Sequence, residues 1–147
     1  MIPRIFNVGG PYINHAASYA LGSFIQQALA GGVIEIEARR AVLRSYVHLF
    51  EFARVLFDLA IGDEDDLMFD TAGAEVVEMA DLAVAVGAAL GLELEIRRPP
   101  LSQGEDRYVG DGRIYQAAVA RGAGGPIGLD RIVRDTADYL RELTPPA

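Results

Sequence analysis

The chain has 147 residues, of which 51% are hydrophobic, and it contains no cysteine. This length suits one domain with a sizeable core, and the composition excludes a disordered tail, a disulfide framework and a thiolate metal site. The net charge of −8 argues against nucleic acid as a partner, because binding to a phosphate backbone requires a basic face.

The N-terminal stretch has the pattern of a buried strand that ends in a turn. Residues 4–6 are typical of the end of the strand, and residues 7–11 form the turn. In α/β proteins, ligands bind at such carboxyl ends of strands. The turn therefore raises the question of which site it serves.

Apolar periodicity and glycine stops predict the other elements. In chain order, we expect a helix over 17–30, a strand over 33–37, an extended run over 41–47, a helix over 49–61, an acidic loop over 62–66, a short buried strand over 67–70, a helix over 77–90, a strand over 92–96, mostly loop over 101–126 with a short helix near 114–120, and a helix over 128–142. Because helices and strands alternate, the fold class is α/β, and no linker divides residues 1–147, which predicts a single domain.

Two of these helices carry further predictions. The helix over 49–61 is apolar on nearly all sides, which predicts burial on more than one side. The last helix places Arg131 with Asp135, and Arg134 with Asp138, at the i, i+4 spacing of ion pairs on its outer face.

Some chemistries are excluded by residues that the chain lacks. All 13 basic residues are arginine, so a phosphate loop ending in Gly-Lys, a Schiff base and a Tyr-x-x-x-Lys pair are all absent. No serine lies in a Gly-x-Ser-x-Gly turn, and we assign no catalytic residue. His15 and His48 lie in separate elements, so we assign no metal site. No signal pattern and no membrane-spanning apolar run is present, which predicts a cytoplasmic protein without a membrane partner.

The candidate ligand-binding residues are an asparagine, glycines and arginines. Asn7 and Gly10 lie in the N-terminal turn, where glycine permits a close backbone approach and asparagine offers a donor and an acceptor; an ordinary turn is the alternative. Arg44 lies in an extended run before a buried helix, where it could clamp a phosphate or, alternatively, pair with a glutamate. Arg97 and Arg98 end a strand, where they could hold an anion or form a solvated charge pair.

Two further features are weaker candidates. His48 could act as an acid or a base, but a lone histidine beside an apolar helix is more often a packed structural residue. The glycine-rich segment 122–126 precedes a helix, but no strand is predicted before it, so a plain turn is favoured over a phosphate loop.

Several motifs occur in a recognisable order. They are Arg4-Ile5-Phe6-Asn7-Val8-Gly9-Gly10-Pro11, then Phe24-Ile25-Gln26-Gln27-Ala28-Leu29-Ala30-Gly31, then Arg44-Ser45-Tyr46-Val47-His48-Leu49-Phe50-Glu51-Phe52-Ala53, a helix with Asp81-Leu82-Ala83, and a loop with Gly104-Glu105. This order resembles the C-terminal, substrate-binding part of the extended short-chain dehydrogenase/reductase family, the NAD-dependent epimerases and dehydratases of nucleotide sugars. The family patterns are Arg-x-Phe-Asn-Val-Tyr-Gly-Pro, Phe-Ile-x-x-Ala-Leu-x-Gly and Arg-Asp-Tyr-Val-His-Val-Asp-Asp-Leu-Ala.

The resemblance implies roles for individual residues. Asn7 takes the place of the asparagine that contacts the nucleotide sugar, and Arg44 takes the place of the arginine that holds its diphosphate. Arg97 and Arg98 lie slightly upstream of a further family arginine. The chain departs from the family at Gly9, where the pattern has an aromatic residue, and in the acidic pair after His48.

The resemblance also implies a fold and a set of functions. We expect a small mixed sheet with helices, without the N-terminal dinucleotide-binding half. The glycine-rich cofactor turn and the Tyr-x-x-x-Lys pair of the family lie upstream of its Arg-x-Phe-Asn segment, and this chain has neither. It is therefore not expected to transfer hydride alone, and NAD(P) is expected only for a longer parent enzyme.

Three interpretations remain open at this stage. The chain is the nucleotide-sugar-binding portion of such an enzyme, a free-standing module that binds a nucleotide sugar or a protein partner, or a decayed fragment that still folds. The resemblance also implies that strands near residues 4–8 and 67–70 belong to the parallel sheet of the missing half. In isolation they would expose apolar edges and faces, which predicts a homodimer, a swapped assembly or pairing with the missing half. A site that has lost half its contacts is expected to bind the nucleotide sugar weakly.

Overall fold

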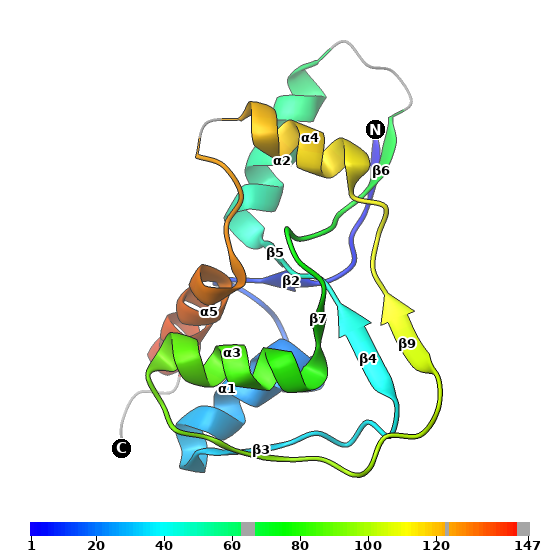
Figure 1. The fold of residues 1–147 in the computed structure, drawn as a ribbon. Coiled ribbons are helices and arrows are strands. Elements are labelled where there is room, and N and C mark those ends of the chain that lie inside the picture. Colours follow the sequence, from blue (N-terminus) through cyan, green and yellow to red (C-terminus); the bar gives the residue numbers. More distant parts are fainter. Residues whose placement is uncertain (63–66, 123, 144–147) are drawn as a thin grey trace.

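A computed structural model describes residues 1–62, 67–122 and 124–143, which form an α/β fold (Figure 1). The described strands are β1 (Ile2–Arg4), β2 (Val8–Gly9), β3 (Val33–Glu35), β4 (Ala41–Arg44), β5 (Val47–His48), β6 (Met68–Asp70), β7 (Val77–Glu78), β8 (Glu95–Arg97) and β9 (Glu105–Tyr108). The described helices are the 3-10 turn η1 (Ala16–Ser18) and α1 (Ala20–Gly31), α2 (Leu49–Ile61), α3 (Met79–Leu90), α4 (Arg113–Arg121) and α5 (Leu129–Leu143). The predicted acidic loop lies mostly outside the described residues.

The strands form small sheets, most of them parallel. β1 pairs with β6, β2 with β5, and β3 with β8, each in parallel. A mixed sheet has the order β7-β4-β9, in which β4 runs parallel to β9 and antiparallel to β7. The predicted small mixed sheet with helices is therefore confirmed.

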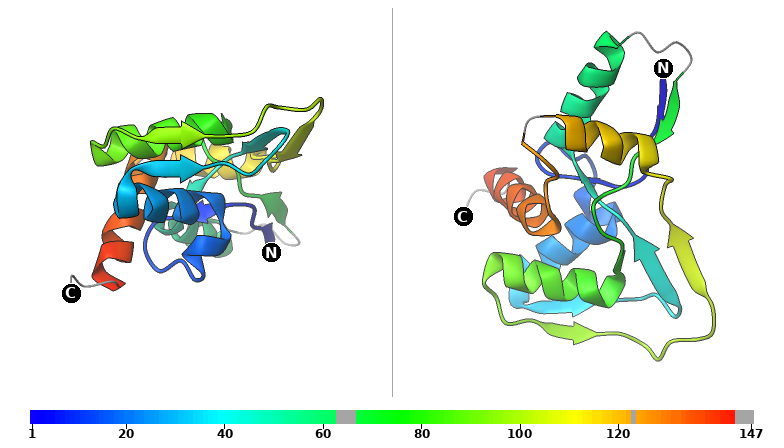
Figure 2. Two further views of the ribbon diagram at one scale, coloured as in Figure 1. Left: turned by 90° about the horizontal axis from the view of Figure 1, so that it is seen from below. Right: turned by 45° about the horizontal axis from the view of Figure 1, so that its top comes forward.

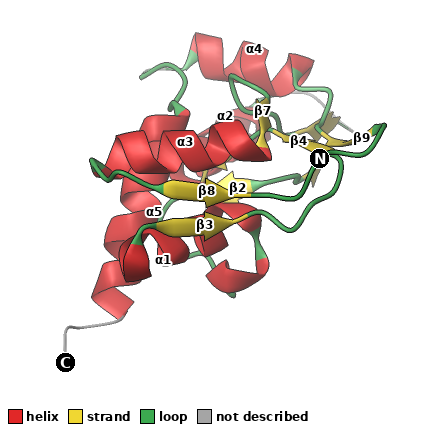
Figure 3. Ribbon diagram, turned by 60° about the horizontal axis from the view of Figure 1, so that its bottom comes forward, coloured by secondary structure: helices red, strands yellow, loops and turns green. Residues whose placement is uncertain are grey.

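Three helices enclose the larger part of the core. α1, α3 and α5 pack against one another, and the β3–β8 pair runs between α1 and α3 (Figure 3). The periodic apolar residues of the sequence face this core, and they include Leu21, Ile25, Leu82, Val86, Ile132 and Val133. Gly32 and Gly91 end α1 and α3 in the left-handed conformation that glycine adopts without a Cβ clash.

A second, smaller core cluster lies at the end of the molecule opposite α1 and α3, where α2 crosses α4 (Figure 2). Val55, Phe69 and Tyr115 are buried there. The prediction that α2 is buried on more than one side is wrong for this chain, because Phe57 is 66% exposed and Ile61 is 83% exposed. The described elements pack against one side of α2 and leave an apolar strip open to solvent.

Several local predictions are corrected by tertiary contacts. The expected strand over residues 4–8 is split into β1 and β2, which pair with different partners. The strand expected over 92–96 begins later, since the backbone of Leu92 bonds back to Gly87 at the end of α3. β9 lies in the segment that the sequence predicts as mostly loop, because its residues Glu-Asp-Arg-Tyr show no apolar alternation. The structure shows a strand there instead.

The ion pairs of α5 are confirmed in one of two cases. Arg131 bonds Asp135 at 2.7 Å, as predicted. Arg134 instead bonds Asp130, one turn toward the N-terminus, and Asp138 forms an ion pair with Arg141 at 2.9 Å. Long helical side chains point back toward the N-terminus of their helix, which favours this choice of partner.

Candidate functional site

A cavity of about 510 Å³ lies where the N-terminal turn, the start of α1 and strand β4 meet. It brings together Asn7 and Arg44, two residues that the sequence singled out from distant segments. Its further lining residues are Phe6, Val8, Ile13, Asn14, Ser18, Tyr19, Ala20, Leu21, Gly22, Val42, Tyr46 and Met79. The lining is mostly apolar with a few polar groups, as is usual for small-molecule sites.

Asn7 is held in place between β1 and β2. Its side-chain Nδ2 donates to the carbonyl of Ser45 at 3.1 Å, and its carbonyl accepts from the N–H of Val47 at 3.0 Å. Its Oδ1 receives no hydrogen bond from a described residue. The side chain is therefore oriented by the β5 segment and keeps one acceptor for a ligand.

Arg44 is held at the end of β4 by backbone and side-chain acceptors. Nη1 donates to the carbonyls of Leu43 at 2.9 Å and Asp106 at 3.0 Å, and Nη2 donates to Asp106 Oδ2 at 3.0 Å. The guanidinium lies 5.8 Å from the ring centroid of Tyr108, which packs at 4.6 Å on Phe6. The Arg44 side chain is 20% exposed, so its charge faces the cavity from a fixed position.

Tyr46 is a buried, neutral residue of the cavity wall. Burial raises the pKa of Tyr46 to about 12, although the positive charge of Arg44 acts in the opposite direction. The phenol therefore stays protonated at neutral pH and can act as a hydrogen-bond donor. Arg44 and Tyr46 lie two residues apart, which places them on the same side of the extended chain.

The structure places Gly10 outside this cavity, in the packed turn beside α5. Its backbone N–H donates to Thr136 Oγ1 at 2.7 Å, and its φ of 103° favours glycine. A Cβ at this position would lie 3.0 Å from His48 Nε2. The contacts of Gly10 therefore account for this glycine by packing and backbone geometry.

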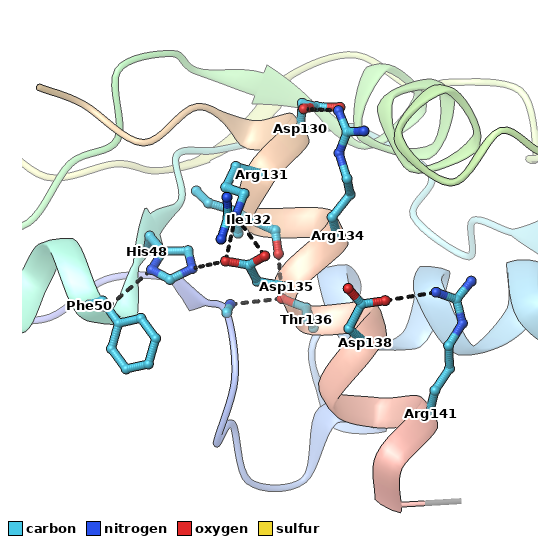
Figure 4. Close-up of polar contacts among 11 residues, drawn as sticks. His48, Phe50, Asp130, Arg131, Ile132, Arg134, Asp135, Thr136, Asp138 and Arg141 are labelled. Carbon is cyan, nitrogen blue, oxygen red and sulfur yellow. Dashed lines mark hydrogen bonds and ion pairs between the residues drawn. The ribbon is translucent and has the colours of Figure 1, made fainter. Parts of the chain in front are cut away.

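His48, the last residue of β5 and the N-cap of α2, is buried against this turn and has two partners. Its Nε2 lies 3.1 Å from Asp135 Oδ2, and its Nδ1 accepts from the N–H of Phe50 at 3.1 Å, capping α2 (Figure 4). With 1% of the residue exposed, His48 is a packed structural histidine. Asp135 is also held by Arg131, so β5 and α5 are joined through this network.

Gly9 departs from the aromatic residue of the family pattern for a steric reason. A Cβ at this position would lie 2.6 Å from Leu21 Cδ2 and would also overlap Ile132 Cγ2. α1 and α5 therefore leave no room for a side chain in this turn.

Arg97 and Arg98 are not among the residues that line the cavity. Arg97 bonds Glu95 of its own strand β8 at 2.7 Å and Glu35 of the neighbouring strand β3 at 3.2 Å. These bonds raise the pKa of Arg97. Arg98 makes two hydrogen bonds to Glu78, at 2.8 and 3.1 Å. Both arginines therefore form charge pairs, which was the alternative interpretation from the sequence.

Sequence reasoning missed two residues of β9, Asp106 and Tyr108, that surround Arg44. β9 carries no apolar alternation, so neither residue had a strand assignment. The only sequence signal was the Gly104-Glu105 motif just before them. Pairing of β9 with β4 puts Tyr108 opposite Arg44 and Asp106 opposite Val42.

In the described residues, neither the glycine-rich segment nor the acidic side chains form an arrangement typical of a dinucleotide or metal site. The glycine-rich segment that begins at Gly122 follows helix α4 rather than a strand, so it is not the strand–turn–helix that binds a pyrophosphate. Within residues 1–62, 67–122 and 124–143, no group of three His, Asp or Glu side chains is placed to hold a metal. In the same ranges, no helix is long and apolar enough to cross a bilayer.

Sequence comparisons find no matching family model and no matching curated protein. Solved structures with this fold include the UDP-glucose 4-epimerase of Thermotoga maritima with UDP-glucose, which is 20% identical, with a TM-score of 0.74 over 97% of this chain and 46% of its own. They also include the UDP-glucuronic acid 4-epimerase of Bacillus cereus with UDP-glucuronic acid and NAD, at 18% identity and a TM-score of 0.75 over 97% of this chain and 45% of its own. A third is the UDP-glucose 4-epimerase of Thermus thermophilus with NAD, at 23% identity and a TM-score of 0.70 over 95% of this chain and 45% of its own.

The chain spans about half the length of these enzymes, and the likeness covers nearly all of it. This agrees with the resemblance that the motif order implies. The chain therefore has the fold of about half of an NAD-dependent nucleotide-sugar epimerase or dehydratase of the extended short-chain dehydrogenase/reductase type.

Proposed function

We propose that residues 1–147 form one substrate-binding unit that holds the diphosphate of a nucleotide sugar in the cavity beside Arg44. The observation that carries this proposal is the meeting of Asn7 and Arg44 in one cavity, although they lie 37 positions apart in sequence. The fold supports it, since the enzymes that share the fold include one solved with UDP-glucose and one with UDP-glucuronic acid.

Arg44 has the chemistry that diphosphate binding needs. A guanidinium carries five N–H donors in a planar fork and binds phosphate oxygens through two parallel bonds. Three of these donors serve Leu43 and Asp106, so among the described residues Nε–H and one Nη2–H have no partner and are available to a ligand. Tyr19 and Phe6 provide aromatic surface nearby for the base or the sugar.

We propose no hydride transfer for this chain by itself, because it carries no cofactor turn and no catalytic lysine. In a longer parent enzyme, NAD(P) would be bound by other residues, and this unit would supply the substrate side of the active site. With part of the contacts missing, the affinity of the unit for a nucleotide sugar is expected to be weak.

The experiment that tests the proposal is a calorimetric titration of UDP and dTDP into the wild-type chain and the Arg44→Ala variant. We expect binding by the wild type and at least a tenfold loss in Arg44→Ala, the usual scale of a lost charge-assisted contact. Arg134→Ala is the matched control, since it removes the same charge from the outer face of α5, away from the cavity lining. Equal binding by the wild type and Arg44→Ala, or none by either, would refute the proposal.

The second candidate is a free-standing module that binds a partner protein, either a second copy or the missing half. An exposed apolar surface favours it: Ile2, Ile5 and Met68 are 59%, 49% and 53% exposed along the β1–β6 pair. Apolar edge strands of this kind invite pairing with another chain. We expect a homodimer by light scattering at micromolar concentration, and a monomer there would count against self-association.

A further inference from the structure

We propose that Asp106 acts as a built-in counter-ion of Arg44 that makes the site select a sugar-linked diphosphate over a free nucleoside diphosphate. This inference rests on the proposed function, because it concerns the charge of the ligand that binds in the same cavity. It concerns a residue that no motif identified and that pairing of β9 with β4 brings to the site.

The position of Asp106 is fixed by the sheet. Its register partner is Val42, which lines the cavity, and the neighbouring pair in register is Arg44 with Tyr108. Facing positions of adjacent strands point to the same side of a sheet, so Asp106 shares the side of Val42 and Arg44. Its Oδ2 reaches Arg44 Nη2 at 3.0 Å, and its backbone carbonyl accepts from Nη1 at the same distance.

The hydrogen bonds of Arg44 show where an anion has to bind. Both hydrogens of Nη1 are taken, by the carbonyls of Leu43 and Asp106, and one hydrogen of Nη2 is taken by the Asp106 carboxylate. The donors without a partner in the described part of the chain are Nε–H and the second Nη2–H, which form the adjacent edge of the guanidinium. An anion therefore binds beside Asp106 and shares the positive charge with it, without displacing it.

This arrangement lowers the affinity for each additional negative charge. Arg44 and Asp106 together carry no net charge, and the Asp106 side chain, 48% exposed, stays paired with the arginine beside the free edge. The terminal phosphate of a free nucleoside diphosphate carries about −2 near neutral pH, since its second pKa is about 6. Esterification to a sugar reduces that charge to about −1, so repulsion by Asp106 is stronger for the free diphosphate than for the sugar-linked one.

The test is a set of titrations with UDP, UDP-glucose and uridine against the wild type and Asp106→Asn. The asparagine keeps an acceptor for Arg44 Nη2 and the same backbone carbonyl, so it removes the charge and leaves Arg44 in place. Removing one charge that lies about 6 Å from the bound phosphate, in a partly exposed site, is expected to change the affinity by roughly five- to tenfold. We therefore expect UDP to bind about five- to tenfold more tightly to Asp106→Asn, UDP-glucose to gain less, and uridine to gain nothing.

Glu105→Gln is the matched control, because it removes the same charge from the same strand, one position before Asp106. Adjacent residues of a strand project to opposite sides of the sheet, so the Glu105 side chain faces away from Arg44. Two results with Asp106→Asn would overturn this inference: an affinity gain for uridine as large as that for UDP, or a UDP affinity that is unchanged or reduced. The proposed function would stand in either case if Arg44→Ala still weakens UDP binding at least tenfold. Equal binding by the wild type and Arg44→Ala, or no binding of UDP and UDP-glucose to any variant, would overturn the proposed function together with it.

Discussion

Glu78 offers a test of how electrostatics joins three segments of this fold. It is the last residue of β7 and the N-cap of α3, where its side chain accepts from the N–H of Ala80 at 2.8 Å. The same carboxylate accepts two hydrogen bonds from Arg98 and one from the N–H of Val42 at 3.3 Å. Replacing it with glutamine should therefore loosen α3, β4 and the segment after β8 together.

The size of the effect follows from the pKa of this carboxyl. Burial by itself would raise the pKa of Glu78, but the hydrogen bonds from Arg98, Ala80 and Val42 outweigh it and lower the pKa from 4.5 to about 2. A shift of this size corresponds to roughly 3 kcal/mol of folding free energy. Because the side chain is 18% exposed, solvent screening reduces our expectation to about 2 kcal/mol.

The sign of the pH dependence is fixed by the direction of this shift. A carboxyl whose pKa is lowered on folding stabilises the fold fully above its ordinary value of 4.5, and the contribution is lost as the pH falls toward 2. The Glu78→Gln variant lacks this contribution at every pH. The difference in unfolding free energy between the wild type and Glu78→Gln should therefore be largest near pH 7 and shrink steadily below pH 4.5.

Urea denaturation followed by far-UV circular dichroism at pH 7, 5 and 3.5 measures this difference directly. Glu75→Gln is the matched control, since Glu75 is exposed nearby and has no hydrogen bond or ion pair to a described residue. A difference between the wild type and Glu78→Gln that stays constant from pH 7 to 3.5 would refute the electrostatic argument. The stability difference would then have to be attributed to hydrogen bonding that is independent of charge.

Three further substitutions test the packing of the turn and of the second core, each by thermal or urea unfolding. Gly9→Ala places a methyl group into side chains of α1 and α5 and should cost about 1–3 kcal/mol; an unchanged melting temperature would show that this turn has free space. Thr136→Val removes the hydroxyl that accepts the buried N–H of Gly10 and should cost about 1–2 kcal/mol, whereas Thr136→Ser should retain most of the stability. Tyr115→Phe removes the hydroxyl that donates to the buried carboxylate of Glu51 at 2.8 Å and should also cost about 1–3 kcal/mol; no loss would mean that water replaces it.

The main elements of the fold were predictable because their physical signals are local. α1, α2, α3 and α5 follow apolar periodicity, and they were expected within a few residues of their ends. The α/β class follows from the alternation of these helices with short apolar runs. The short β9 was not predictable, since its residues form a strand only through backbone pairing with β4.

In the candidate site, too, the residue types were predictable from the sequence, but their side-chain partners were not. The residue types and their place beyond strand ends were sufficient to select Asn7 and Arg44, and the cavity contains both. Arg97 and Arg98 had the same residue type and a similar local position, but their side chains pair with Glu35, Glu95 and Glu78 from other segments. Local sequence does not report which carboxylate a long side chain reaches, so these assignments could not be separated in advance.

The sequence by itself determined the class of the fold, most of the helices, the lack of a lysine-based mechanism and two of the polar residues of the cavity, Asn7 and Arg44. These properties depend on composition, periodicity and residue type, each of which is read along the chain. Only the tertiary structure decided that Gly10 and His48 pack beside α5 and that Asp106 lies against Arg44. Those contacts join residues 62 to 126 positions apart, and such pairings are fixed by how strands and helices pack.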